Sequence, residues 1–109
     1  MMSSATIISP ESCRDMAEIR HEIDRIDQQV ISLIGERYQF VKAAAKFKKT
    51  ADQVQANSRF ESMLRQRREW AVECGLEPDV IEALYRDLVG WFISEEMTHW
   101  SRQQSAADR

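Results

Sequence analysis

The chain has 109 residues, of which 43% are hydrophobic and 30% are charged, with only three glycines and two prolines. This length accommodates one domain, and the scarcity of glycine and proline disfavours an all-β fold with many turns. The formal net charge is −3, so the chain is not basic overall, as nucleic-acid-binding domains typically are.

No apolar run approaches the roughly 18 residues of a membrane span, and the start of the chain lacks the basic and apolar regions of a secretory signal. The two cysteines, Cys13 and Cys74, are far apart and do not have the spacing of a CxxC or metal-binding motif. Free thiols in a reducing compartment are the simplest interpretation. We therefore expect an all-helical domain in the cytoplasm.

The first ten residues end in a proline and predict a flexible N-terminal arm. A long helix is predicted over about residues 12–48, because apolar residues recur there at spacings of three and four. These residues are Met16, Ile19, Ile23, Ile26, Val30 and Leu33, followed after one interruption by Phe40, Ala44 and Phe47.

Residues 49–57 show no strong periodicity and are predicted to form a loop. Ser58 and Glu61 have the spacing of a capping box, which predicts the start of a second helix. Gly75 fits the end of that helix, and Pro78 fits the first turn of a third helix. Apolar residues at helical spacing predict the buried faces of both helices. They are Phe60, Met63, Leu64, Trp70, Ala71 and Cys74 in the second helix, and Ile81, Leu84, Tyr85, Leu88, Phe92 and Ile93 in the third. A flexible tail is expected at residues 101–109, so the predicted helical domain covers residues 11–100.

The length of the first predicted helix bears on the oligomeric state. About 35 residues at 1.5 Å each give roughly 50 Å, whereas a compact chain of this size has a radius of gyration of only about 13 Å. Such a helix is too long to bury its apolar face within its own chain. A second copy related by a two-fold axis is the simplest partner. A helical dimer without enzymatic activity would satisfy the same pattern.

Two basic residues interrupt the apolar pattern near the end of this helix. Arg37 occupies a position where an apolar residue is expected, and a buried arginine requires a partner. Lys48 follows eleven residues later, which on a continuous helix is about 20° from the same face. Val41 and Ala44 lie between them on that face. We expect an anion-binding site here.

Two further arginines are candidates for the same site. Arg20 precedes Arg37 by about 25 Å along the helix, so both residues cannot contact one small molecule within one chain. An antiparallel pairing of two copies would bring Arg20 of one chain near Arg37 of the other. Arg59 lies at the predicted start of the second helix, where free N–H groups also favour an anion.

Glu96 lies on the largely apolar line of the third helix, between Phe92 and Trp100. A carboxyl group in such surroundings is expected to ionise reluctantly, although a nearby Lys48 would oppose this effect. Its neighbour Glu95 is expected to face water. His21 and His99 have no ligand partners at suitable spacing, so no metal site is predicted.

The spacing of these residues resembles that of a known family. The segment IRHEIDRIDQQVISLIGERYQFVKAAAKFK resembles the first helix of the all-helical chorismate mutases. REWAVECGLEP and WFISEEMTHW extend the similarity, which covers about residues 11–100. The chain is most similar to the isochorismate-pyruvate lyase branch of bacterial salicylate synthesis.

This resemblance implies an intertwined homodimer of three-helix chains that needs no metal or organic cofactor and acts on a small dicarboxylate. It assigns Arg20 to the arginine that crosses the dimer, and Arg37, Lys48 and Arg59 to the other cations around the substrate. The resemblance also implies that Val41, Ala44 and Ile93 line the pocket. Glu96 occupies a position where the family commonly has glutamine.

Two substitutions separate the lyase and mutase branches. The mutases usually have an acidic residue after the arginine of the second helix, but here Phe60 follows Arg59, and Ala56 replaces another acidic residue. The resemblance thus favours an isochorismate-pyruvate lyase with weak chorismate mutase activity. A dedicated chorismate mutase and a non-enzymatic dimerisation module remain alternatives.

Overall fold

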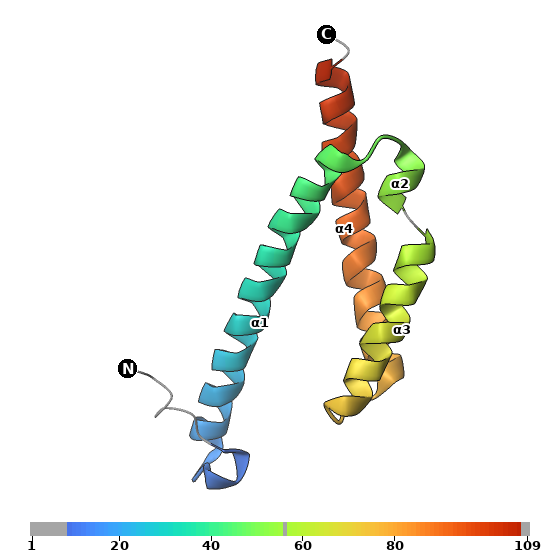
Figure 1. The fold of residues 1–109 in the computed structure, drawn as a ribbon. Helices are drawn as coiled ribbons and strands as arrows, with labels where there is room; N and C mark the ends of the chain where they lie inside the picture. Colours follow the sequence, from blue (N-terminus) through green and yellow to red (C-terminus); the bar gives the residue numbers. More distant parts are fainter. Residues whose placement is uncertain (1–8, 56, 108–109) are drawn as a thin grey trace. The chain divides into compact units, whose positions relative to one another are not determined.

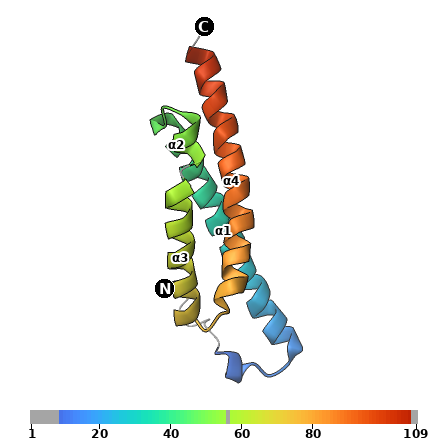
Figure 2. The ribbon, with the colours of Figure 1, turned by 90° about the vertical axis from the view of Figure 1, so that its right-hand side faces the viewer.

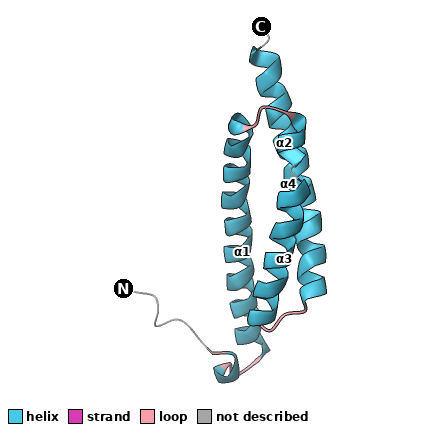
Figure 3. Ribbon diagram, turned by 45° about the vertical axis from the view of Figure 1, so that its right-hand side comes forward, coloured by secondary structure: helices cyan, strands magenta, loops and turns pink. Residues whose placement is uncertain are grey.

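The computed structural model describes residues 9–55 and 57–107, and every regular element within these ranges is helical (Figures 1 and 3). The all-helical class predicted from the sequence is therefore confirmed. The elements in chain order are η2 (Pro10–Ser12), α1 (Met16–Ala44), η3 (Ala45–Phe47), α2 (Ala51–Gln55), α3 (Asn57–Glu73) and α4 (Pro78–Ala107). Within the described ranges, no helix is both long and apolar enough to cross a membrane.

The chain divides into two compact parts, Met1–Arg37 and Tyr38–Arg109, and the boundary falls within α1. In the first part, α1 begins at Met16 and not near residue 12. The carboxylate of Asp15 accepts a hydrogen bond from the Glu18 N–H at 2.9 Å and thereby caps the helix. The preceding turn, η2, is a separate 3-10 helix that begins at Pro10. Most of the predicted N-terminal arm, residues 1–8, lies outside the described residues.

The predicted apolar line of α1 is not buried within this chain. No residue of α1 is buried, and several of the apolar side chains are about half exposed. These side chains are Met16, Ile23, Ile26, Val30 and Leu33. The single chain therefore presents a long apolar surface along this helix, larger than the scattered apolar residues usual on a protein surface.

In the second part, α3 runs alongside α4, and α2 and η3 also contact α4 (Figures 1 and 2). The centre of this packing is formed by Met63 and Leu64 of α3 and Val89 of α4. Partly buried side chains of Phe60, Tyr85 and Ile93 surround it. All of these residues except Val89 lie on the apolar faces that the sequence predicts.

Two large residues predicted on those faces are not buried. Trp70 is 47% exposed and Leu84 is 56% exposed. Each of these two helices is covered by its neighbour over a narrow face only, so part of its apolar surface stays open. Val80 and Trp91 also contribute exposed apolar area on α4.

The turn between α3 and α4 has the form that the sequence predicts. Gly75 adopts a φ of +76°, which a residue with a side chain rarely adopts. The Leu76 N–H donates to the Ala71 carbonyl at 2.8 Å, and the Gly75 N–H donates to the Val72 carbonyl at 3.1 Å. This is the Schellman pattern that ends helices. Pro78 is the first residue of α4, as predicted.

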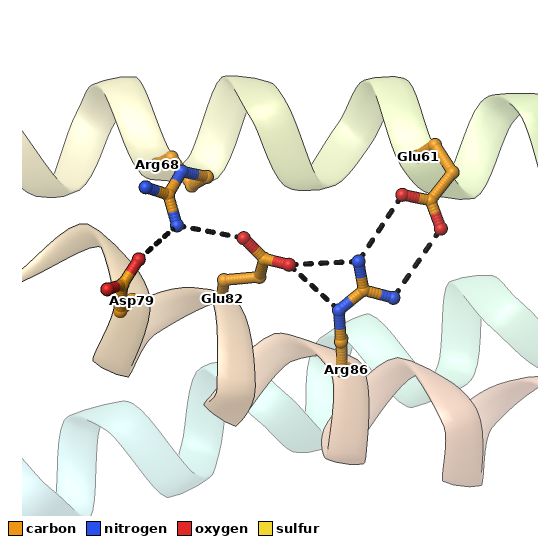
Figure 4. Close-up of polar contacts among 5 residues, drawn as sticks. All are labelled: Glu61, Arg68, Asp79, Glu82 and Arg86. Atoms are coloured by element: carbon orange, nitrogen blue, oxygen red, sulfur yellow. Dashed lines mark hydrogen bonds and ion pairs between the residues drawn. The ribbon is translucent and has the colours of Figure 1, made fainter.

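A network of charged side chains joins α3 to α4 (Figure 4). The carboxylate of Glu82 lies between two arginines and accepts hydrogen bonds from Arg68 at 2.8 Å and Arg86 at 2.9 Å. Arg68 also donates to Asp79 at 2.7 Å, and Arg86 also contacts Glu61 of α3. Because the members come from both helices, the network fixes how α3 and α4 align.

Besides the bounds of α1, three predicted boundaries differ from the structure. The predicted loop at 49–57 contains α2, where Val54 is buried and Thr50 Oγ1 accepts the Gln53 N–H at 3.2 Å. Ser58 does not cap the next helix, because α3 already includes Asn57. Finally, α4 continues through Ala107, since the segment after Trp100 contains no helix-breaking residue.

Candidate active site

Lys48 and Glu96 form an ion pair within the second part of the chain. Lys48 Nζ lies 3.1 Å from Glu96 Oε2, and only 9% of the Glu96 side chain is exposed. The same oxygen has no hydrogen-bond donor among the described residues, so the contact is ionic and not a directed hydrogen bond. A buried carboxylate oxygen without a donor is uncommon and calls for a physical reason, such as a role in binding a ligand.

The backbone geometry at Lys48 explains where its ammonium group points. The chain leaves the 3-10 helix η3 at this residue, which has an extended conformation with φ −93° and ψ 137°. The ammonium group donates a hydrogen bond to the Gln53 carbonyl at 3.1 Å. The Lys48 carbonyl accepts a hydrogen bond from the Trp100 indole N–H at 2.9 Å. Lys48 is thus held by contacts to both its main chain and its side chain.

Three predicted pocket residues lie in the same part of the chain as this ion pair. Val41 and Ala44 are half-buried on the last turns of α1, just before η3. Ile93 is half-buried on α4, three residues before Glu96. These apolar side chains belong to the same part of the chain as Lys48. By contrast, Arg59 is exposed in the first turn of α3.

The other two predicted arginines lie in the first part of the chain. Arg20 is exposed and Arg37 is half-buried, both on α1. The prediction that Lys48 shares a helical face with Arg37 assumed one continuous α-helix, and this assumption is wrong. The α-helix ends at Ala44 and a 3-10 turn follows, so 100° per residue does not apply as far as Lys48.

Glu95 does not face water as the sequence suggested. Its Oε1 atom accepts a hydrogen bond of 2.7 Å from the hydroxyl group of Tyr38. This hydrogen bond is the largest factor that raises the pKa of Tyr38 above its ordinary value, because it stabilises the protonated phenol. The Tyr38 ring also packs against Trp91 and Phe92, with ring centroids 5.1 and 5.8 Å away. These contacts tie the end of α1 to α4 beside Glu96.

The sequence analysis missed two residues that contact Lys48. Gln53 lay in the predicted loop, although the order of Thr50 and Gln53 is that of a capping box and could have indicated α2. Trp100 was noted only as an apolar neighbour of Glu96. Its indole N–H requires an acceptor when it is partly buried, which was the available signal.

Both cysteines are free thiols, Cys13 being half-buried and Cys74 exposed. Across residues 9–55 and 57–107, no group of three or more histidine, cysteine, aspartate or glutamate side chains is arranged to hold a metal ion.

Comparison with known proteins gives two matches. The family model for chorismate mutase type II matches residues 19–97, a range that contains all eight predicted site residues. The chain is also 37% identical over 99 residues to a protein of Pseudomonas aeruginosa named isochorismate pyruvate lyase. That similarity covers 91% of this chain and 98% of the Pseudomonas protein. The chain therefore belongs to the chorismate mutase type II family.

Proposed function

We propose that the protein is an isochorismate pyruvate lyase that converts isochorismate to salicylate and pyruvate, with a secondary chorismate mutase activity. The observation that carries this proposal is the Lys48–Glu96 ion pair of 3.1 Å, which joins two predicted catalytic residues on separate elements. The 37% identity to the Pseudomonas lyase supports the choice of reaction. Phe60 after Arg59 supports it as well, because the mutases usually have an acidic residue there.

The proposed reaction needs no nucleophile and no co-reactant. A ring hydrogen of isochorismate moves to the methylene carbon of the enolpyruvyl group while the bond between the ring and the ether oxygen breaks. The electrons of the broken bond form the carbonyl of pyruvate, and the ring becomes aromatic as salicylate. The protein holds the substrate in the reactive conformer and stabilises negative charge that develops on the ether oxygen.

Lys48 is the residue proposed to stabilise that oxygen. Its ammonium group is a compact charge, and its contacts to Gln53 and Glu96 hold it in place before substrate arrives. Glu96 is proposed to contact the substrate beside the same oxygen, to which a protonated carboxyl group would donate a hydrogen bond. Val41, Ala44 and Ile93 would exclude water around the ring.

The substrate carboxylates are proposed to bind the arginines. Arg37 and Arg59 would contact them from the same chain, and Arg20 from a second chain. A guanidinium group matches a carboxylate with two parallel hydrogen bonds, which suits a dicarboxylate substrate.

We also propose that two copies form an intertwined dimer through α1. The long apolar surface of this helix is half exposed in the single chain, and α4 presents further apolar residues at Val80, Leu84 and Trp91. Contiguous apolar surface of this kind favours association. Arg20 and Arg37 are about 25 Å apart along one helix, so a shared site requires the second copy.

Incubation with each substrate tests the proposed reaction. Isochorismate should yield salicylate, measured by its fluorescence, together with pyruvate, and chorismate should yield prephenate more slowly. Prephenate formation without any salicylate would contradict the lyase assignment and favour a dedicated mutase. Turnover of neither substrate by a dimeric protein would favour a non-enzymatic dimerisation module.

A further inference from the structure

We infer that Trp100 is a positioning residue for Lys48: it fixes the main chain of Lys48 while Glu96 contacts its ammonium group. This inference rests on the catalytic role proposed for Lys48. It concerns a residue outside the set of proposed substrate contacts, and Trp100 acts through Lys48 and does not touch the substrate.

The main-chain carbonyl of Lys48 needs a partner because of where it lies. Carbonyl groups at the end of a helix lack N–H donors within the helix. Lys48 follows the last residue of η3 and is already extended, so its carbonyl points away from the helix axis. The indole N–H of Trp100 supplies the missing donor at 2.9 Å, across 52 residues of sequence. This hydrogen bond anchors the end of η3 to α4.

Trp100 and Glu96 act on Lys48 from one face of one helix. They are four residues apart on α4, which is about one turn, so their side chains lie one above the other. Trp100 contacts the main chain of Lys48 and Glu96 contacts the end of its side chain. A rigid helix thereby sets the distance between the two ends of the lysine.

The two contacts together limit the freedom of a flexible side chain. A lysine that is held only at its ammonium group can reach that point from several main-chain positions and rotamers. Fixing the carbonyl as well removes most of these alternatives. The segment that follows, in which Lys49 N–H donates to Gln53 Oε1 at 2.6 Å, is anchored by the same hydrogen bond. Loss of the indole N–H should therefore loosen both Lys48 and residues 49–53.

The test replaces Trp100 and measures turnover of isochorismate in two backgrounds. Trp100→Phe removes the N–H and keeps an aromatic ring, and Trp70→Phe on α3 is the matched control. Because removing one partner leaves the Lys48 carbonyl unsatisfied, kcat should fall about tenfold in Trp100→Phe, with a smaller change in KM. In the Lys48→Ala background, Trp100→Phe should cause no further loss. Trp70→Phe should leave kcat unchanged in both backgrounds.

A second measurement does not depend on activity. Amide hydrogen exchange of residues 49–53 should be faster in Trp100→Phe than in the unsubstituted protein and in Trp70→Phe. Benzothienylalanine at position 100 keeps the shape of indole and replaces the N–H with sulfur, so it should reproduce both effects even if Trp100→Phe destabilises the fold.

The outcomes separate this inference from the proposed function. The positioning role would be overturned if kcat is unchanged both in Trp100→Phe and in the benzothienylalanine protein. It would also be overturned if Trp100→Phe lowers kcat by the same factor in the Lys48→Ala background as in the unsubstituted protein. In either case the lyase assignment stands. If the unsubstituted protein turns over neither substrate, the proposed function fails. Hydrogen exchange of residues 49–53 then tests the anchoring of Lys48 by itself. Faster exchange in Trp100→Phe supports the anchoring, and unchanged exchange overturns it.

Discussion

Glu96 lies 3.1 Å from the ammonium group of Lys48, and this contact joins the residue at which η3 ends to a buried position on α4. Each group lowers the cost of placing the other away from water, because an isolated buried charge is strongly disfavoured. The pair therefore holds a positive charge in a partly buried environment, where a charge interacts with a nearby group more strongly than it does in water.

Replacement of Lys48 should reduce turnover without unfolding the protein. Lys48→Ala removes a fixed charge that is proposed to stabilise the transition state, so kcat/KM for isochorismate should fall by roughly 10²- to 10³-fold. The melting temperature should fall, because the buried Glu96 loses its ion-pair partner, so turnover is compared at a temperature at which both proteins are folded. Lys49→Ala is the control, because Lys49 is exposed and has the same charge. Near-normal turnover in Lys48→Ala would exclude the residue from this role.

Replacement of Glu96 tests whether it donates a hydrogen bond. Glu96→Gln keeps the shape and adds an amide donor, so most activity should remain, whereas Glu96→Ala should lose it. An amide can donate the hydrogen bond that is proposed at this position. If Glu96→Gln loses as much kcat/KM for isochorismate as Glu96→Ala does, a hydrogen-bond donor at position 96 does not support turnover.

The proposed dimer predicts recovery of activity from two inactive variants. Arg20→Ala and Arg37→Ala homodimers should each be nearly inactive. When the two chains are unfolded together and refolded, a heterodimer contains one site with both arginines, so about a quarter of the sites in the mixture should be intact. Recovery close to that value, measured by salicylate formation, supports a site built by both copies. Normal heterodimers without recovered activity would overturn the assignment of Arg20 to the partner's site.

The charged network between α3 and α4 predicts a loss of stability in acid. The pKa of Glu82 is below its ordinary value of 4.5, chiefly because Arg86 and then Arg68 donate hydrogen bonds to its carboxylate. A depressed pKa in the folded state means that this contribution is fully present above pH 4.5 and is lost as the pH falls further. Glu82→Gln should therefore lower the melting temperature near neutral pH and flatten its fall below about pH 4.5.

The control for that measurement is Glu69→Gln, at an exposed position of α3. Its melting temperature should follow that of the unsubstituted protein at each pH. If Glu82→Gln and the unsubstituted protein lose stability in parallel, the network does not account for the acid sensitivity.

The turn at Gly75 predicts a conformational effect on stability. Gly75→Ala forces a side chain onto a backbone with φ of +76°, which costs about 1 kcal/mol of unfolding free energy. Cys74→Ala, in the same turn and at an exposed position, should change stability much less. Urea denaturation of both variants provides the comparison. Equal stability of Gly75→Ala and the unsubstituted protein would mean that the turn relaxes to another conformation.

The sequence by itself determined the helical class and the placement of the main helices. Apolar residues spaced three and four apart lie on one face of a helix, so this spacing predicts a helix. Gly75 and Pro78 have backbone preferences that predict a helix end and a helix start. The same reasoning located the buried positions Met63 and Phe92. The sequence also offered Lys48 and Glu96 as candidate site residues, although the helical face proposed to reach Lys48 ends at Ala44.

Only the tertiary structure decided how Lys48 is held. The end of α1 at Ala44, the short helix α2 and the hydrogen bond from Trp100 all depend on contacts with α4, which lies far away in sequence. The helix propensity of a short segment does not predict such contacts. A five-residue helix such as α2 is unstable without tertiary packing. The ion pair between Lys48 and Glu96 has the same origin: the sequence named both residues, but packing against α4 brought their charges together.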